Sequence, residues 1–86
     1  MESYNVFVKP SVYRDMDKIP KKNRKKIIEK IWGLSEDPRP NGAIKLSGKE
    51  KYRFRQGNYR ILYEICDGEL IVTVVKVGHR KNAYKK

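Results

Sequence analysis

The chain has few of the residues on which covalent and metal catalysis depend. It contains one cysteine, Cys66, and one histidine, His79. A single cysteine excludes an intramolecular disulfide, which suits the reducing cytoplasm where we expect the protein. We interpret Cys66 as a half-buried small apolar residue rather than as a nucleophile, because it ends a stretch in which apolar and polar residues alternate.

Two cofactor motifs are also missing. The Asp and Glu residues are scattered along the chain, and no His, Cys, Asp and Glu cluster has the spacing of metal ligands. No glycine-rich loop leads into a Lys-Ser or Lys-Thr pair, so nucleotide hydrolysis is not expected. We therefore expect neither a metal nor any other cofactor.

Long hydrophobic runs are absent as well. No apolar stretch approaches the ~20 residues that a membrane-spanning helix needs. The N-terminal residues lack a basic stretch followed by a long apolar run, so no signal peptide is expected. A basic helix in the first half could lie on a membrane surface, but so small a domain needs the apolar stripe of that helix for its core. We expect no membrane partner.

Positive charge is what the chain has in excess. Its 86 residues include 21 Lys and Arg against 10 Asp and Glu, which gives a net charge of +11. Such an excess on a small body favours a polyanionic partner, above all nucleic acid or the ribosome; the alternative is a basic protein with a solvated surface. The length predicts one domain, residues 1–86, whose single core must also carry any functional site.

The residue pattern predicts an α+β fold. Residues 4–8 alternate as a strand does, residues 11–16 suit a short helix, and residues 21–34 show the period of a longer helix with one apolar stripe. The stripe consists of Ile27, Ile28, Ile31, Trp32 and Leu34. Three further strands follow at residues 52–55, 59–65 and 70–77, with turns between them and Gly78 as the end of the last. We expect an antiparallel sheet of three to four strands, with the helical hairpin covering one face.

The free face of that sheet is expected to be basic. Residues 52–55 read Tyr-Arg-Phe-Arg, so Arg53 and Arg55 share one face while Tyr52 and Phe54 share the other. Whether Arg60 joins the two arginines depends on the strand register, which the sequence leaves open.

Four arginines suit cleavage of RNA by its own 2′-hydroxyl. This reaction needs a group that takes the 2′-proton, a group that protonates the leaving 5′-oxygen, and cations around the crowded phosphorane. Arginine serves the last role because its planar guanidinium donates two parallel hydrogen bonds to a phosphate. The candidates are Arg53, Arg55, Arg60 and Arg80. The alternative is a solvated basic face.

Two further side chains could move a proton. His79 has the only side chain with an ordinary pKa near neutrality, although it could equally be a surface histidine or one bonded to a backbone carbonyl. Tyr84 could move a proton or stack on a base, or simply pack against the fold. Lysines on the main helix and in the C-terminal tail are candidate RNA and ribosome contacts. They are Lys22, Lys25, Lys26, Lys81 and Lys85.

An ordered set of segments resembles the RelE-type toxins of the RelE/ParE superfamily. The set comprises residues 45–48 (Lys-Leu-Ser-Gly), 52–64 (Tyr-Arg-Phe-Arg-Gln-Gly-Asn-Tyr-Arg-Ile-Leu-Tyr-Glu), 77–80 (Val-Gly-His-Arg) and Tyr84. The resemblance covers nearly the whole chain. It implies a microbial-ribonuclease-like fold and metal-independent cleavage of messenger RNA in the ribosomal A site. It also implies neutralisation by a small antitoxin encoded alongside, through which the complex binds its own operator DNA.

The resemblance also assigns roles to residues. Arg53 and Arg55 match the paired basic positions of RelE-type toxins, Arg60 matches the arginine after the turn, Arg80 the arginine past the last strand, and Tyr84 the tyrosine near the end. The paired positions are lysines in the best-known members, where one is thought to act as general base. Because an arginine is very rarely deprotonated, the base is open here, with His79 and Tyr84 as candidates.

Two alternatives remain within the same superfamily. A ParE-like toxin inhibits DNA gyrase by binding and cleaves nothing. A relative that has lost activity would bind only RNA or its antitoxin.

Overall fold

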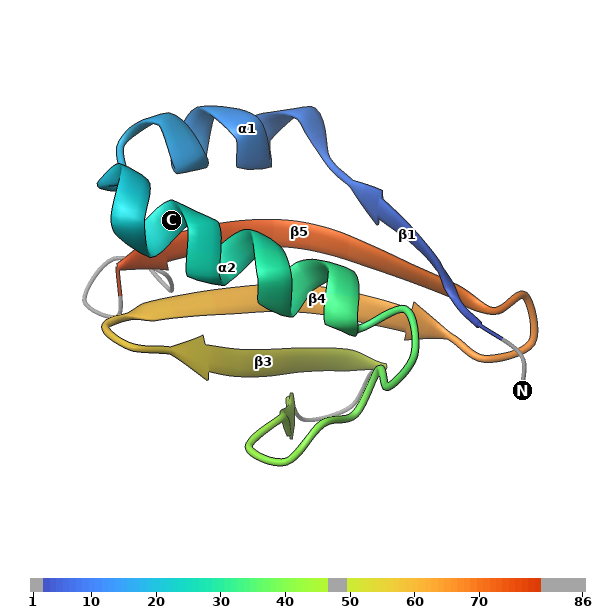
Figure 1. The fold of residues 1–86 in the computed structure, drawn as a ribbon. Helices are drawn as coiled ribbons and strands as arrows, with labels where there is room; N and C mark the ends of the chain where they lie inside the picture. The colour runs from blue at the N-terminus through green and yellow to red at the C-terminus, as the bar shows by residue number, and fades with distance from the viewer. Residues whose placement is uncertain (1–2, 47–49, 80–86) are drawn as a thin grey trace.

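Two helices and five strands make up the described part of the chain (Figure 1). A computed structural model describes residues 3–46 and 50–79. The elements are β1 (Asn5–Val8), α1 (Pro10–Asp17), α2 (Lys21–Gly33), β2 (Ile44–Leu46), β3 (Lys51–Gln56), β4 (Tyr59–Cys66) and β5 (Ile71–His79). No helix of the described ranges is long and apolar enough to cross a membrane.

Both helices start at or next to a proline and have no side-chain cap at the N-terminus. Pro10 lies in the first turn of α1 and Pro20 immediately precedes α2, where a fixed φ costs nothing. Neither N-cap residue makes a side-chain hydrogen bond to its helix. The helices therefore depend on burial of one apolar face against the sheet.

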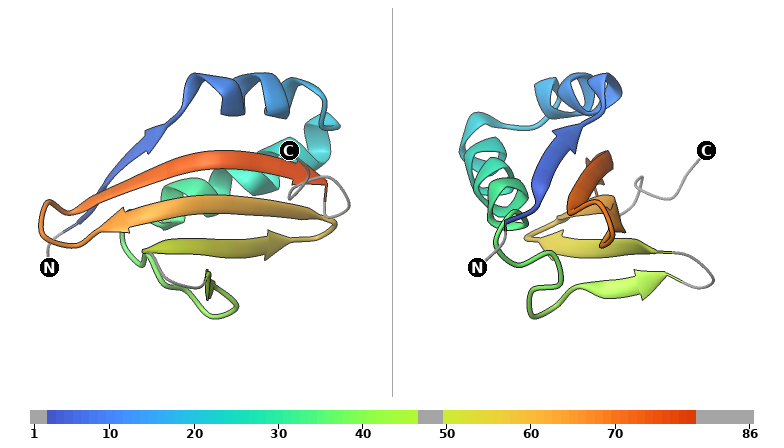
Figure 2. Two further views of the ribbon diagram at one scale, coloured as in Figure 1. Left: turned by 180° about the vertical axis from the view of Figure 1, so that it is seen from behind. Right: turned by 90° about the vertical axis from the view of Figure 1, so that its right-hand side faces the viewer.

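The sheet order is β1-β5-β4-β3-β2. Strands β3, β4 and β5 form an antiparallel meander, and β2 pairs antiparallel with β3. β1 pairs with β5 in the parallel sense, because the helical hairpin carries the chain across one face of the sheet before the meander begins. The α+β class with helices on one face is confirmed (Figure 2, right). The sheet itself has five strands, including the short β2 and a parallel pair, where the sequence predicts three or four antiparallel strands.

The core lies between the helical layer and the sheet. Its buried residues are Val12, Met16, Ile19, Ile27, Ile31 and Leu34 from the helical layer, and Tyr52, Phe54, Ile61, Tyr63, Ile65, Val72, Val74 and Val77 from the strands. Tyr63 is fully buried, and its hydroxyl donates a hydrogen bond of 2.8 Å to the carbonyl oxygen of Pro38. Burial raises the pKa of Tyr63 to about 12, so this donor keeps its proton.

Three expectations about single residues were wrong. Ile28 and Trp32 belong to the apolar stripe of α2 by spacing, yet both are exposed, because the stripe is wider than the strip of helix that meets the sheet. Gly78 does not end the last strand, which continues through His79. Cys66 is exposed rather than half-buried, since it lies at the end of β4 on the face that the helices leave uncovered.

A polar network closes the end of the sheet near the β4–β5 turn. Arg39, in the loop after α2, donates hydrogen bonds of 2.8 and 3.1 Å to the Asp67 carboxylate and one of 2.9 Å to the Tyr52 hydroxyl. Glu50 accepts a further bond from Arg39, and Tyr4 donates one of 2.6 Å to Asp67. The bonds from Arg39 and Tyr4 lower the pKa of Asp67 to about 2. The network thereby ties the loop after α2 to β3 and to the β4–β5 turn.

Candidate nucleic-acid interface

The strand register places three arginines on one face of the sheet. Arg55 pairs directly with Arg60, and Arg53 pairs with Leu62. Their neighbours Phe54 and Ile61 are buried against the helices, so the arginines lie on the opposite, helix-free face. This surface, which carries Arg53, Arg55 and Arg60, is called the arginine face below. The register thus answers the question that the sequence left open for Arg60.

Arg55 and Arg60 form a like-charge pair across two strands. Side chains that lie directly opposite in an antiparallel ladder have Cβ atoms about 4.5–5.5 Å apart, and like charges there destabilise the sheet. On the other side of Arg60 the partner residue is Gly78, which adds no side chain to this part of the face. Two arginines are therefore placed directly opposite each other on neighbouring strands, an arrangement that suits a phosphate group.

The distribution of charge on this side of the sheet changes along the strands. At the far end of β3, Lys51 lies opposite Glu64 with 3.5 Å between the amine and the carboxylate. The network of Arg39 with Asp67 and Glu50 closes the same end. Near the β3–β4 turn, by contrast, the strand register places Arg55 directly opposite Arg60.

His79 lies on the other face of the sheet. It pairs with Tyr59, whose ring packs against the core, and the two rings meet edge to face with 5.6 Å between their centroids. His79 and Tyr59 line a hollow of about 390 Å³ together with Asp15 and Lys18 from the helical layer. The structure therefore does not bring His79 together with the arginine face.

The remaining predicted site residues fall into two groups. Lys22, Lys25 and Lys26 lie on α2 with exposed side chains, on the side of the sheet opposite the arginine face. Arg80, Lys81, Tyr84 and Lys85 lie outside the described residues. Within residues 3–46 and 50–79, no group of three or more His, Cys, Asp and Glu side chains could hold a metal ion.

Residues 6–84 match the family model described as the ParE toxin of the type II toxin–antitoxin system parDE. The chain belongs to the RelE/ParE superfamily of toxins. A relative in Methanocaldococcus jannaschii, described as putative toxin RelE1, is 31% identical over 95% of this chain and 96% of its own length. Toxin RelG of Mycobacterium tuberculosis is 29% identical over 96% of this chain and 98% of its own length.

Solved structures of the superfamily share the whole fold of this member. The archaeal RelE–RelB complex from Pyrococcus horikoshii contains a chain with a TM-score of 0.82 and 27% identity, over 93% of this chain and 98% of that one. The RelBE2 toxin–antitoxin complex from M. tuberculosis contains a chain with a TM-score of 0.79 and 28% identity, over 91% of this chain and 99% of that one.

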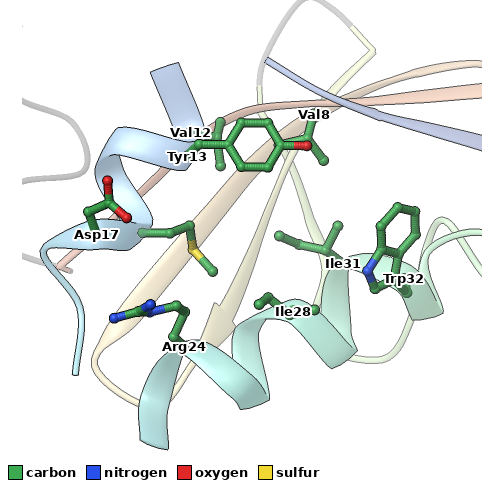
Figure 3. Close-up of a pocket in the computed structure, with 9 residues that line it drawn as sticks. Val8, Val12, Tyr13, Asp17, Arg24, Ile28, Ile31 and Trp32 are labelled. Carbon is green, nitrogen blue, oxygen red and sulfur yellow. The ribbon is translucent and has the colours of Figure 1, made fainter. Parts of the chain in front are cut away.

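A second surface, which the sequence pattern did not reveal as such, is an apolar groove between α1 and α2 (Figure 3). Its volume is about 290 Å³, and it is lined by Val8, Val12, Tyr13, Met16, Asp17, Arg24, Ile28, Ile31 and Trp32. Two of the lining aromatic side chains, Tyr13 and Trp32, are 62% and 57% exposed. The signal in the sequence was the width of the α2 stripe, since two of its five residues, Ile28 and Trp32, remain exposed in the groove.

One charged side chain of this groove is poorly satisfied. The Arg24 guanidinium donates a hydrogen bond of 3.1 Å from Nη2 to the carbonyl oxygen of Ile19. Its Nε atom is buried and has no hydrogen-bond partner among the described residues. A buried donor without an acceptor is costly, so an acceptor on a bound partner would be stabilising here.

Proposed function

We propose that the protein is a ribosome-dependent endoribonuclease that cleaves messenger RNA in the ribosomal A site without a metal ion. The observation that carries the proposal is the direct pairing of Arg55 with Arg60, with Arg53 on the same face. Three guanidinium groups on one face of a rigid sheet are costly for the fold and well suited to a phosphorane. The names and folds of the relatives support the same reading.

In this proposal the 2′-hydroxyl of the RNA attacks the adjacent phosphorus, and the bond from phosphorus to the 5′-oxygen breaks. The products are a 2′,3′-cyclic phosphate and a 5′-hydroxyl. Arg55 and Arg60 donate hydrogen bonds to the non-bridging oxygens, whose charge grows in the transition state. Arg80, the arginine past the last strand, adds a third donor to the same phosphate.

The proton transfers need another group, because arginine keeps its protons. The position of His79 on the helix side of the sheet favours Tyr84 for this role. A tyrosine with an ordinary pKa of ~10 can act as a base only where nearby cations lower that pKa, and the arginine face supplies such cations. Weak proton transfer suits an enzyme whose substrate is aligned by the ribosome, since alignment alone lowers a barrier by several kcal/mol.

Contacts with the ribosome also use the opposite side of the molecule in this proposal. Lys22, Lys25 and Lys26 add positive charge on α2, which attracts ribosomal RNA without touching the scissile phosphate. The tail lysines Lys81 and Lys85 belong to the same class of contact. The cytoplasm, where ribosomes translate messages, is the expected compartment.

The second candidate is binding and inhibition of DNA gyrase without any cleavage. It is favoured by the match of residues 6–84 to a model of ParE toxins. A gyrase binder has no use for two arginines held directly opposite one another, which is why we rank this function second. An inactive relative that only binds RNA or an antitoxin is the third.

The expected protein partner is an antitoxin, as in the RelE–RelB and RelBE2 complexes formed by the relatives. An acidic antitoxin segment covers the arginine face in this proposal, and through the antitoxin the complex binds operator DNA. The groove between α1 and α2 takes an amphipathic antitoxin helix. The apolar side of this antitoxin helix packs on Ile28 and Trp32. A carboxylate of the same helix accepts a hydrogen bond from the buried Nε of Arg24.

The test is in vitro translation with primer extension along the message, with and without the purified protein. We expect new 3′ ends within codons on translating ribosomes and little cleavage of naked RNA. Equal cleavage of naked RNA would refute ribosome dependence. Intact messages together with blocked supercoiling by gyrase would move the assignment to the second candidate.

A further inference from the structure

Lys76 occupies a strand position on the arginine face, while its side chain also lines the hollow beside His79, and the proposed mechanism does not use it. Leu62 pairs with Lys76, and Arg60 pairs with Gly78. Leu62 and Arg60 alternate with the buried Ile61, so Leu62 and its partner Lys76 share the face of Arg60. Lys76 is therefore a diagonal neighbour of Arg60, at the about 7–8 Å that separates such residues in an antiparallel ladder.

An irregularity in β5 brings Lys76 to this face. The pairing shifts between Leu62 and Tyr63: Tyr63 pairs with Val74 and Leu62 with Lys76, which leaves Val75 as an extra residue. In a regular ladder Val75 would oppose Leu62, and Lys76 would oppose Ile61 and point into the core. Such bulges re-aim side chains and are enriched beside active sites. The extra residue therefore gives Lys76 a strand position on the arginine face.

Among the residues that the structure describes, no strand covers the edge of β5 beside Lys76. The pairing with β1 ends at Val8 and Val74, and beyond this point the strand faces α1. There Asp15 of α1 accepts a hydrogen bond of 3.3 Å from the backbone N–H of Val77, and its other oxygen lies 3.5 Å from the Lys76 amine. The Lys76 side chain thus reaches round the open edge to a carboxylate of the helical layer.

The ion pair between Lys76 and Asp15 is weak enough to open readily. Its separation is 3.5 Å, and the Lys76 side chain remains 42% exposed, so the attraction is weak. When the Lys76 amine leaves, Asp15 still accepts the hydrogen bond from the backbone N–H of Val77, so its carboxylate is not left without a partner. Lysine carries a compact charge on a flexible stem, which lets the amine swing from the edge onto the arginine face.

We propose that Lys76 binds the RNA phosphate adjacent to the one held by Arg55 and Arg60, and that Asp15 retains it while RNA is absent. This inference rests on the proposed function, because the scissile phosphate defines the neighbouring one. Lys76 contributes equally to ground state and transition state, since the phosphate it binds does not react. Asp15 acts as a competitor of the RNA for the same amine.

The experiment measures binding of a single-stranded RNA oligonucleotide as a function of salt, together with single-turnover cleavage on translating ribosomes. We expect Lys76→Gln to weaken oligonucleotide binding about fivefold and to lower the slope of log affinity against log salt by about 0.7. In single-turnover cleavage, Lys76→Gln should raise the ribosome concentration at which the rate is half-maximal, and it should leave the maximal rate unchanged. Lys76→Arg should restore both.

Lys51→Gln is the matched control. Lys51 also lies on the helix-free face, with the same 3.5 Å ion pair and a similar exposure of 46%, but its partner Glu64 lies directly opposite at the far end of the strands. This variant removes the same charge, and we expect it to leave both the salt slope and the half-saturating concentration close to those of the parent.

Asp15→Asn tests the competition. Asparagine keeps an oxygen for the N–H of Val77 and loses the charge that holds Lys76. Asp15→Asn should tighten RNA binding about threefold in the parent protein. In the Lys76→Gln background it should have no effect. Equal effects in both backgrounds would overturn the proposed competition.

The outcomes separate this inference from the proposed function. If Lys76→Gln matches Lys51→Gln in RNA binding, the role of Lys76 is wrong even where the parent cleaves messages. The parent protein could cleave no message while Lys76→Gln still weakens RNA binding and flattens the salt slope. In that case the nuclease assignment fails and the phosphate contact stands. A parent that binds no RNA overturns both.

Discussion

Replacing Arg55 by glutamine should make the protein more stable and nearly inactive. The two effects have one cause, since Arg55 and Arg60 lie directly opposite each other on β3 and β4. Their repulsion is present in the folded sheet and largely absent in the unfolded chain. The same pair of charges is what the proposed reaction uses to stabilise the phosphorane.

The size of the stability gain follows from the pairing. Guanidinium groups on directly opposite residues, about 7 Å apart at a solvated surface, repel each other by roughly 0.5 kcal/mol or somewhat more. This agrees with the range of about 0.2–1 kcal/mol for cross-strand pairs. For a domain of this size, 0.5 kcal/mol raises the melting temperature by about 2–4 °C. Loss of one transition-state donor should lower the cleavage rate by about a hundred- to a thousandfold.

The assay combines thermal unfolding at low and high salt with single-turnover cleavage on translating ribosomes. The gain in melting temperature should largely vanish in 1 M salt, where the screening length falls to about 3 Å. Lys51→Gln is the control, because Lys51 faces Glu64 across the same two strands and its loss should leave stability unchanged or slightly lower. A drop in melting temperature for Arg55→Gln, or a fully active enzyme, would refute the reasoning.

The remaining predictions concern the polar network, the groove and the tail. The pKa of Asp67 is about 2 in the folded protein against an ordinary 3.8, so Asp67 stabilises the fold above about pH 3.8 and this contribution is lost as the pH falls through 2. The difference in melting temperature between parent and Asp67→Asn should therefore shrink between pH 5 and pH 2; a constant difference would contradict the shift. Ile28→Glu should weaken co-purification with the antitoxin encoded alongside and leave cleavage on ribosomes intact, and unchanged co-purification would remove the groove as a contact. Arg80→Ala should abolish toxicity while ribosome binding stays within a few-fold, as measured by growth arrest and ribosome pelleting; a toxic variant would remove Arg80 from the site.

The local pattern of residues was enough to predict the elements that position the arginine face. The alternation at residues 52–55 predicted that Arg53 and Arg55 share the face away from the core, and β3 confirms it. The period of residues 21–34 predicted α2, and three of the five residues in its apolar stripe are buried. These features depend on the period of 2 in a strand and of 3.6 in a helix, which each segment carries by itself.

Tertiary structure decided how those segments meet. The parallel pairing of β1 with β5 depends on where the helical hairpin crosses the sheet, and no residue of β1 encodes it alone. The bulge at Val75 moves Lys76 to the arginine face and Val77 into the core, and it is set by the pairing with β4. The faces of Arg60 and His79, one on each side of the sheet, follow from the same register. Register couples residues far apart in the chain, and a shift by one position moves every side chain of a strand to the other face.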